Sequence, residues 1–134
     1  MKTTTVWKND QHFTGHQEGN SNPIELDGSG QKGFAPKATL LSALAACSGI
    51  DVVETLKKMR VDFSDLKIEV ESEQTNEHPK VFKDIFITFK MKTEAANEDK
   101  VRKAIDLSLE KYCGVAAMLK KNSAISYQLE IKNS

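Results

Sequence analysis

Two cysteines, Cys47 and Cys113, have the side chains best suited to chemistry, and they are the only cysteines among the 134 residues. Each lies in the middle of a segment whose apolar residues follow a helical pattern. A free cysteine often fills a hydrophobic core, where it behaves as a small apolar residue. As a thiolate it is instead a nucleophile or a metal ligand. The sequence therefore leaves three interpretations of the pair open: core packing, redox chemistry and metal binding.

Charge and hydropathy indicate which partners and compartments to expect. Nineteen basic and nineteen acidic side chains give a formal net charge of zero, so no basic field is present to hold a nucleic-acid backbone. The N-terminus lacks the apolar region of a secretory signal, and the longest apolar stretch, around Leu40 to Cys47, is too short to span a bilayer. We therefore expect a cytoplasmic protein without nucleic-acid or membrane partners. In that reducing compartment a permanent structural disulfide is disfavoured.

The length and the 39% of hydrophobic residues predict a single domain over residues 1–134. β-prone or alternating segments predict strands over 3–7, 12–18, 23–27, 66–71, 81–91 and 125–131. Helices are predicted over 36–59, where Pro36 suits the first turn, and over 98–121, which Asn97 can cap. The order βββ-α-ββ-α-β predicts an α+β fold. The first helix is apolar nearly all round in its front half, so we expect it to be central and buried.

A glycine-rich segment, residues 28–33 with the sequence GSGQKG, precedes the first predicted helix. It invites comparison with phosphate-binding loops, but it lacks their Gly-Lys-Ser/Thr ending and their full spacing. We interpret it as a flexible linker.

Two histidines, His12 and His16, alternate onto one face of a predicted strand. Two imidazoles can contribute to a metal site, but a zinc site needs two more ligands at a recognisable spacing. Surface histidines are the simpler interpretation, and we expect neither a metal nor any other cofactor.

Two carboxylates, Asp51 and Glu54, lie one and two turns beyond Cys47 on its side of the predicted helix. An unpaired carboxylate at this place would disfavour the thiolate. Either Lys58 or another cation neutralises the two carboxylates, or Cys47 is a poor nucleophile.

Three motifs extend through most of the chain. Residues 33–47 read GFAPKATLLSALAAC, Glu77-His78-Pro79 is followed by Phe82 and Ile85, and residues 104–113 read AIDLSLEKYC. In order and spacing these motifs resemble the OsmC/Ohr family of thiol-dependent peroxidases of organic hydroperoxides and their relatives. The first is similar to the family's proline, leucine pair and small-residue run before its reactive cysteine. The third is similar to its second helix with the second cysteine.

The resemblance implies an OsmC-like fold, in which antiparallel sheets wrap around two long central helices of an intertwined homodimer. In that arrangement a cysteine site lies at each end of the subunit interface. Cys47 then matches the peroxidatic cysteine and Cys113 the resolving one. The expected substrate is an organic hydroperoxide, and a thiol reductant is expected to restore the pair.

The chain departs from the peroxidases of this family at the groups that activate the thiolate. Those enzymes use an N-terminal arginine held by a glutamate ten residues before the reactive cysteine, whereas here no arginine precedes Arg60 and that position is Lys37. Roughly 15 Å of helix separates Lys37 from Cys47 of its own chain. Lys37 is therefore a candidate cation only for Cys47 of the partner subunit. His12 and His16 are the other candidates.

Two further interpretations of the chain remain open on the sequence alone. One is a protein on the same scaffold that binds a small ligand without catalysis, which the missing arginine and glutamate favour. The other is a purely structural dimer with two cysteines in its core.

Overall fold

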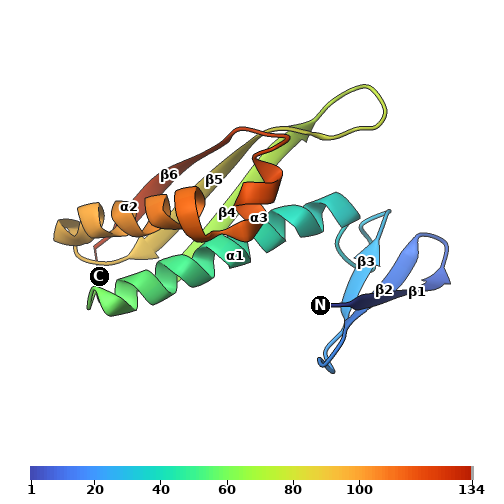
Figure 1. Ribbon diagram of the computed structural model, residues 1–134, viewed down its shortest axis with the longest axis horizontal. Helices are drawn as coiled ribbons and strands as arrows, with labels where there is room; N and C mark the ends of the chain where they lie inside the picture. Colours follow the sequence, from blue (N-terminus) through green and yellow to red (C-terminus); the bar gives the residue numbers. More distant parts are fainter. Residues whose placement is uncertain (134) are drawn as a thin grey trace. The chain divides into compact units, whose positions relative to one another are not determined.

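The computed structural model describes residues 1–133 and divides into two compact units, one from Met1 to Leu41 and one from Ser42 onward. The first unit contains a three-stranded sheet in the order β1-β2-β3 (Figure 1). Its strands are β1 (Thr3–Asn9), β2 (His12–Gln17) and β3 (Ile24–Asp27), and both neighbouring pairs are antiparallel. All three strands lie within about two residues of their predicted bounds.

The glycine-rich segment is an ordered turn folded onto Asp27, so the prediction of a flexible linker is wrong. The carboxylate of Asp27, which is 4% exposed, accepts hydrogen bonds from the backbone N–H groups of Ser29 at 2.9 Å and Lys32 at 3.0 Å. A Cβ atom on Gly33 would lie 2.4 Å from the carbonyl oxygen of Glu25. The glycine therefore permits the turn to approach β3 closely. A glycine-rich sequence is compatible both with such a close approach and with a flexible linker, so the sequence alone could not separate the two.

Helix α1 (Pro36–Lys58) begins at the predicted proline and ends one residue before its predicted limit. From Leu44 onward its core-facing side chains are fully buried: Leu44, Val52 and Leu56. Gly49 is buried and faces β4, where a Cβ atom on it would lie 2.8 Å from the Cδ1 atom of Ile68.

The front half of α1 is largely exposed in the single chain except for Leu44, contrary to the prediction. Leu40 is 47% exposed, and Ala43 and Ala46 are exposed as well. By length and composition alone the 23 residues of α1 are long and apolar enough to cross a membrane, which the prediction from the shorter run around Leu40 to Cys47 did not anticipate. The same features are found in core helices, and the buried residues of its C-terminal part fit that alternative.

The second unit is built on a sheet in the order β4-β5-β6. Strands β4 (Ser64–Gln74) and β5 (Phe82–Lys92) form the predicted long hairpin. Strand β6 (Ile125–Lys132) lies at the other edge and runs parallel to β5, so this sheet is mixed and not entirely antiparallel as expected. The alternation of apolar residues predicts the strand but carries no information about its direction.

The core of the second unit lies between this sheet and the helices. From β5 four alternate side chains are buried: Ile85, Ile87, Phe89 and Met91. Helix α2 (Glu98–Leu107) buries Val101, Ala104 and Ile105. The hydroxyl of Tyr127 on β6 donates a hydrogen bond to Asp106 on α2 at 2.8 Å, which joins helix and strand. Ser108, the residue that follows α2, donates a hydrogen bond to Asp51 on α1, so this end of α2 lies against α1 (Figure 1).

The second predicted helix is interrupted. Helix α2 passes into a π-helical turn (Ser108–Tyr112), the chain becomes extended at Cys113, and a short helix α3 (Gly114–Leu119) follows. Asn97 does not cap α2 with its side chain, which donates to the hydroxyl of Thr93 at 3.1 Å instead. The prediction of one continuous helix over 98–121 is therefore wrong, and the interruption falls at the second cysteine.

Candidate functional site

The two cysteines belong to different elements of the second unit. Cys47 lies on α1, half-buried, three residues after the fully buried Leu44. Cys113 is 3% exposed and stands between the π-helical turn and α3. Both are free thiols. The apolar pattern of α1 thus holds Cys47 at the edge of the core, as its helical spacing predicts.

Cys113 takes the position that precedes the first turn of α3. Its backbone is extended, with φ −75° and ψ 105°, and its Sγ accepts the N–H of Ala116 at 3.3 Å. The sulfur therefore satisfies one of the N–H groups that the start of a helix leaves without a partner. The prediction placed Cys113 within a helix, where its sulfur would have had no such role.

The structure brings the two thiols together. The pKa of Cys113 is raised to about 11, mainly by burial and to a smaller extent by interaction with the Cys47 thiol. The N–H of Ala116, which bonds to the sulfur, has the opposite effect and lowers this pKa. Because Cys113 keeps its proton at neutral pH, it can donate that proton toward a Cys47 thiolate. The pair thus has an asymmetric arrangement, with a buried, protonated thiol beside a more accessible one.

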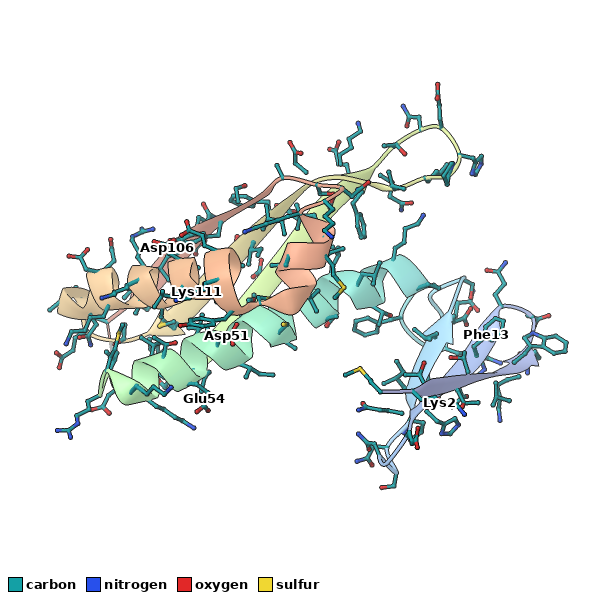
Figure 2. All side chains as sticks on the ribbon, in the orientation of Figure 1. Lys2, Phe13, Asp51, Glu54, Asp106 and Lys111 are labelled. Carbon is teal, nitrogen blue, oxygen red and sulfur yellow. The ribbon has the colours of Figure 1, made fainter. Side chains whose placement is uncertain are left out.

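The carboxylate of Asp51, one turn beyond Cys47, accepts a hydrogen bond from the hydroxyl of Ser108 at 2.8 Å. The sequence left two alternatives: Lys58 or another cation neutralises the two carboxylates, or Cys47 is a poor nucleophile. Glu54 pairs with another cation, Lys57, at 3.7 Å, and both of these side chains are largely exposed. Figure 2 shows Asp51 and Glu54 on α1.

Lys37 lies in the first turn of α1, nearly three turns before Cys47 in the same helix. The helix is continuous between the two residues, as predicted. The hypothesis that Lys37 assists Cys47 of a partner subunit therefore stays a prediction.

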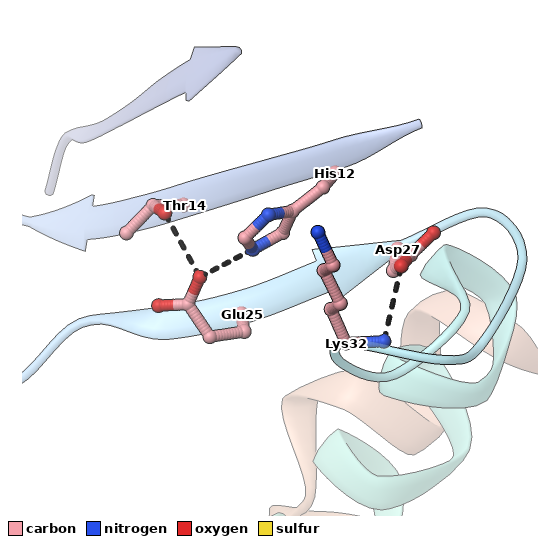
Figure 3. Close-up of polar contacts among 5 residues, drawn as sticks. All are labelled: His12, Thr14, Glu25, Asp27 and Lys32. Atoms are coloured by element: carbon pink, nitrogen blue, oxygen red, sulfur yellow. Dashed lines mark hydrogen bonds and ion pairs between the residues drawn. The ribbon is translucent and has the colours of Figure 1, made fainter. Parts of the chain in front are cut away.

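The two histidines of the first unit do not act together. The Nε2 atom of His12 lies 2.7 Å from the Glu25 carboxylate, which also accepts the hydroxyl hydrogen of Thr14 at 2.9 Å (Figure 3). Both hydrogen bonds lower the pKa of Glu25, and the one with His12 has the larger effect. His16 is exposed at the other end of β2. Among residues 1–133 no group of three His, Cys, Asp or Glu side chains is placed to hold a metal ion.

The residue that sequence reasoning missed is Ser108. It belongs to the apolar stripe of the second predicted helix, and its side chain is completely buried. A polar side chain in an apolar stripe needs a hydrogen-bond partner, and that requirement was the available signal. The identity of the partner, Asp51, depends on how the helices pack and could not be predicted.

Known proteins share both the sequence pattern and the architecture of this chain. The family of OsmC-like proteins matches residues 28–128. Protein YhfA of Escherichia coli K12 is 36% identical over 132 residues, which is 98% of each chain. An OsmC-like protein from Mycoplasma pneumoniae superposes with a TM-score of 0.80 at 20% identity, over 98% of this chain and 95% of that one. OhrB of Bacillus subtilis, an organic hydroperoxide resistance protein, superposes with a TM-score of 0.62 at 18% identity, over 98% and 96% of the two chains.

Proposed function

Because the chain belongs to the OsmC-like protein family, we propose that it is a dithiol redox protein that reduces organic hydroperoxides through Cys47 and Cys113. One observation carries the proposal: the Cys113 thiol is buried, and the Cys47 thiol lies near enough to contribute to the raised pKa of Cys113. The architecture shared with an organic hydroperoxide resistance protein supports the substrate class.

The reaction begins when the Cys47 thiolate attacks the distal oxygen of the hydroperoxide. The O–O bond breaks, Cys47 becomes a sulfenic acid, and the alkoxide leaves as an alcohol after taking a proton. Cys113 then attacks the sulfur of that sulfenic acid, loses its own proton and expels hydroxide, which leaves as water. The product is a Cys47–Cys113 disulfide, and two equivalents of a thiol reductant restore both thiols by exchange.

The assignment of roles follows from burial and protonation. Cys47 is the more accessible thiol, so a hydroperoxide reaches it first. Cys113 has a high pKa and therefore a low thiolate fraction at neutral pH, which makes it a poor first nucleophile. Since it lies near Cys47, it nevertheless can attack the sulfenic acid once that group forms.

The decisive experiment is the intact mass of the reduced protein after one equivalent of an alkyl hydroperoxide. The wild type is expected to lose two hydrogens per chain, as a disulfide does. Cys113→Ser is expected to retain a sulfenic acid that dimedone traps, and Cys47→Ser is expected to stay unchanged. A wild type that remains reduced over hours contradicts the peroxidase function.

We also propose that the protein works in the cytoplasm as a homodimer. A groove of about 510 Å³ runs beside α1 and β4, and its lining includes Ala45, Ala46, Ile50, Val53 and Ile68. Ile50 is 64% exposed in the single chain. A second copy of the same helix would remove this apolar surface from water.

The second candidate function is binding of a small apolar ligand without catalysis. The specific feature that favours it is Lys37, which stands where the peroxidases of the family have their glutamate. If the thiols stay reduced with hydroperoxide while apolar ligands raise the melting temperature, this function replaces the first.

A further inference from the structure

A single buried hydroxyl group links the two elements that carry the cysteines. Ser108 is 0% exposed, and its Oγ donates to the Oδ2 of Asp51 on α1 at 2.8 Å. The same Oγ lies 3.3 Å from the carbonyl oxygen of Ser48. Because Ser48 directly follows Cys47 and Asp51 lies one turn beyond it, Ser108 is attached to the turn of α1 that carries Cys47.

The backbone of Ser108 determines where Cys113 lies. The carbonyl oxygen of Ser108 accepts the N–H of Cys113 at 2.8 Å, and this bond closes the π-helical turn. A π turn carries one more residue than an α turn, and such turns often occur at functional sites. Ser108 therefore contacts the Cys47 turn through its side chain and Cys113 through its main chain.

We propose that Ser108 and Asp51 are positioning residues, which hold Cys113 against Cys47 so that the disulfide can close. The inference rests on the proposed dithiol function. Two thiols held in place react with each other as though each were present at a high effective concentration. Loss of the Ser108–Asp51 hydrogen bond would release the π turn from α1 and lower this effective concentration, while both cysteine side chains stay chemically unchanged.

Asp51 contributes an acceptor to this arrangement, and its charge is not required. It is half-buried, so water can reach its carboxylate if Ser108 is removed. An asparagine in its place keeps an oxygen that accepts the Ser108 hydroxyl hydrogen, whereas alanine keeps none. The two substitutions therefore separate the hydrogen bond from the charge.

The test is a redox equilibrium that needs no hydroperoxide. Reduced protein is equilibrated with mixtures of oxidised and reduced glutathione, in which two thiols and one oxidised glutathione give one protein disulfide and two reduced glutathiones. The equilibrium constant measures the effective concentration of Cys113 at Cys47. Ser108→Ala and Asp51→Ala are expected to lower this constant at least tenfold. Asp51→Asn and Ser108→Thr are expected to stay within about threefold of the wild type.

A matched control separates positioning from general stability. Thr93 is also completely buried, and its hydroxyl donates to the carbonyl oxygen of Asp62 at 2.7 Å. Thr93→Val removes this bond and the one that Asn97 donates to the same hydroxyl, both away from the cysteines, so it is expected to lower the melting temperature and to leave the glutathione equilibrium unchanged. If Ser108→Ala does not fold, Asp51→Ala carries the same comparison.

The outcomes distinguish this inference from the proposed function. If Ser108→Ala and Asp51→Ala close the disulfide with the constant of the wild type, the positioning role is wrong, whatever the reaction with hydroperoxide. If the wild type closes with glutathione but not with hydroperoxide, the peroxidase function fails and a tenfold fall in the variants still supports positioning. A wild type that forms no disulfide with either oxidant overturns both.

Discussion

The Sγ atom of Cys113 lies 3.3 Å from the backbone nitrogen of Ala116, whose N–H it accepts. The thiol of Cys47 lies near enough to the same sulfur to help raise the pKa of Cys113. One atom thus begins helix α3 and completes the dithiol pair. The position of Cys113 is fixed by backbone contacts on both sides, since its own N–H is bound by Ser108.

The two thiols are expected to react with iodoacetamide at different rates. With a pKa of about 11, Cys113 is almost entirely protonated at neutral pH, and it is 3% exposed. Alkylation requires an accessible thiolate. Peptide mass spectrometry of native protein should show Cys113 modified at least about tenfold more slowly than Cys47.

Unfolding provides the control for this experiment. In concentrated urea both thiols are exposed and should react at similar rates. Equal rates in the native protein would show that burial does not protect Cys113, and the assignment of Cys47 as the first nucleophile would lose its basis.

Stability is expected to fall at alkaline pH because of Cys113. Its folded-state pKa is raised above the ordinary 9.0, so the stabilisation is complete below about pH 9 and is lost as pH rises through about 11. The native state holds the proton in that window and the unfolded state does not, which makes the slope negative. The loss is at most about 3 kcal/mol for two pH units.

Urea unfolding of the reduced wild type and of Cys113→Ala between about pH 8 and pH 11 measures this effect. Tyrosines and lysines titrate in both proteins, so the relevant quantity is the difference between them. The free energy of unfolding should decline more steeply in the wild type. Parallel curves would mean that Cys113 has the same pKa in the folded and unfolded chains.

The sequence predicts α1 to within one residue because a single signal governs it: a proline at the start, followed by small and apolar residues at helical spacing. It fails at residues 98–121, where every residue but Gly114 is compatible with a helix. The interruption falls at Cys113, directly before Gly114 and after a π-helical turn whose Ser108 bonds to α1. Local propensity does not include such tertiary contacts.

The sequence locates the cysteines of the candidate site but does not show their environment. Their helical spacing is enough to place Cys47 beside the core. The proximity of the two cysteines and the bond from Ser108 to Asp51 bring together residues 57 or more positions apart. The parallel pairing of β6 with β5 depends likewise on the path of the chain between them, which the alternation of residues does not describe.

Gly33→Ala is expected to destabilise the first unit. The added Cβ would lie 2.4 Å from the carbonyl oxygen of Glu25, a backbone atom that cannot rotate away. The turn must move from β3, at a cost of about 1 to 3 kcal/mol in the free energy of unfolding. Gly114→Ala is the matched control, because no atom lies within 4 Å of its Cβ position. Equal stabilities of the two variants would contradict a tight approach at Gly33.

The homodimer is expected to depend on the exposed face of α1. Ile50→Glu places a charge in the apolar groove beside Ala46 and Val53, so light scattering should show a dimer for the wild type and a monomer for the variant. Lys103→Glu, at an exposed position of α2, should leave the dimer intact. A wild type that is monomeric at micromolar concentration shows that the groove is not a dimer interface.

Lys37→Met is expected to slow the reaction of Cys47 with an alkyl hydroperoxide at least tenfold, if Lys37 of one subunit is the cation beside Cys47 of the partner subunit. The physical reason is that a nearby positive charge favours the thiolate, and methionine keeps the length of the side chain without the charge. Stopped-flow measurement of sulfenic acid formation in Cys113→Ser isolates this first step. Lys57→Met, which removes an exposed lysine farther along the same helix, is the control and should react at the unaltered rate. If both variants react as fast as the Cys113→Ser parent protein, Lys37 is not part of the site.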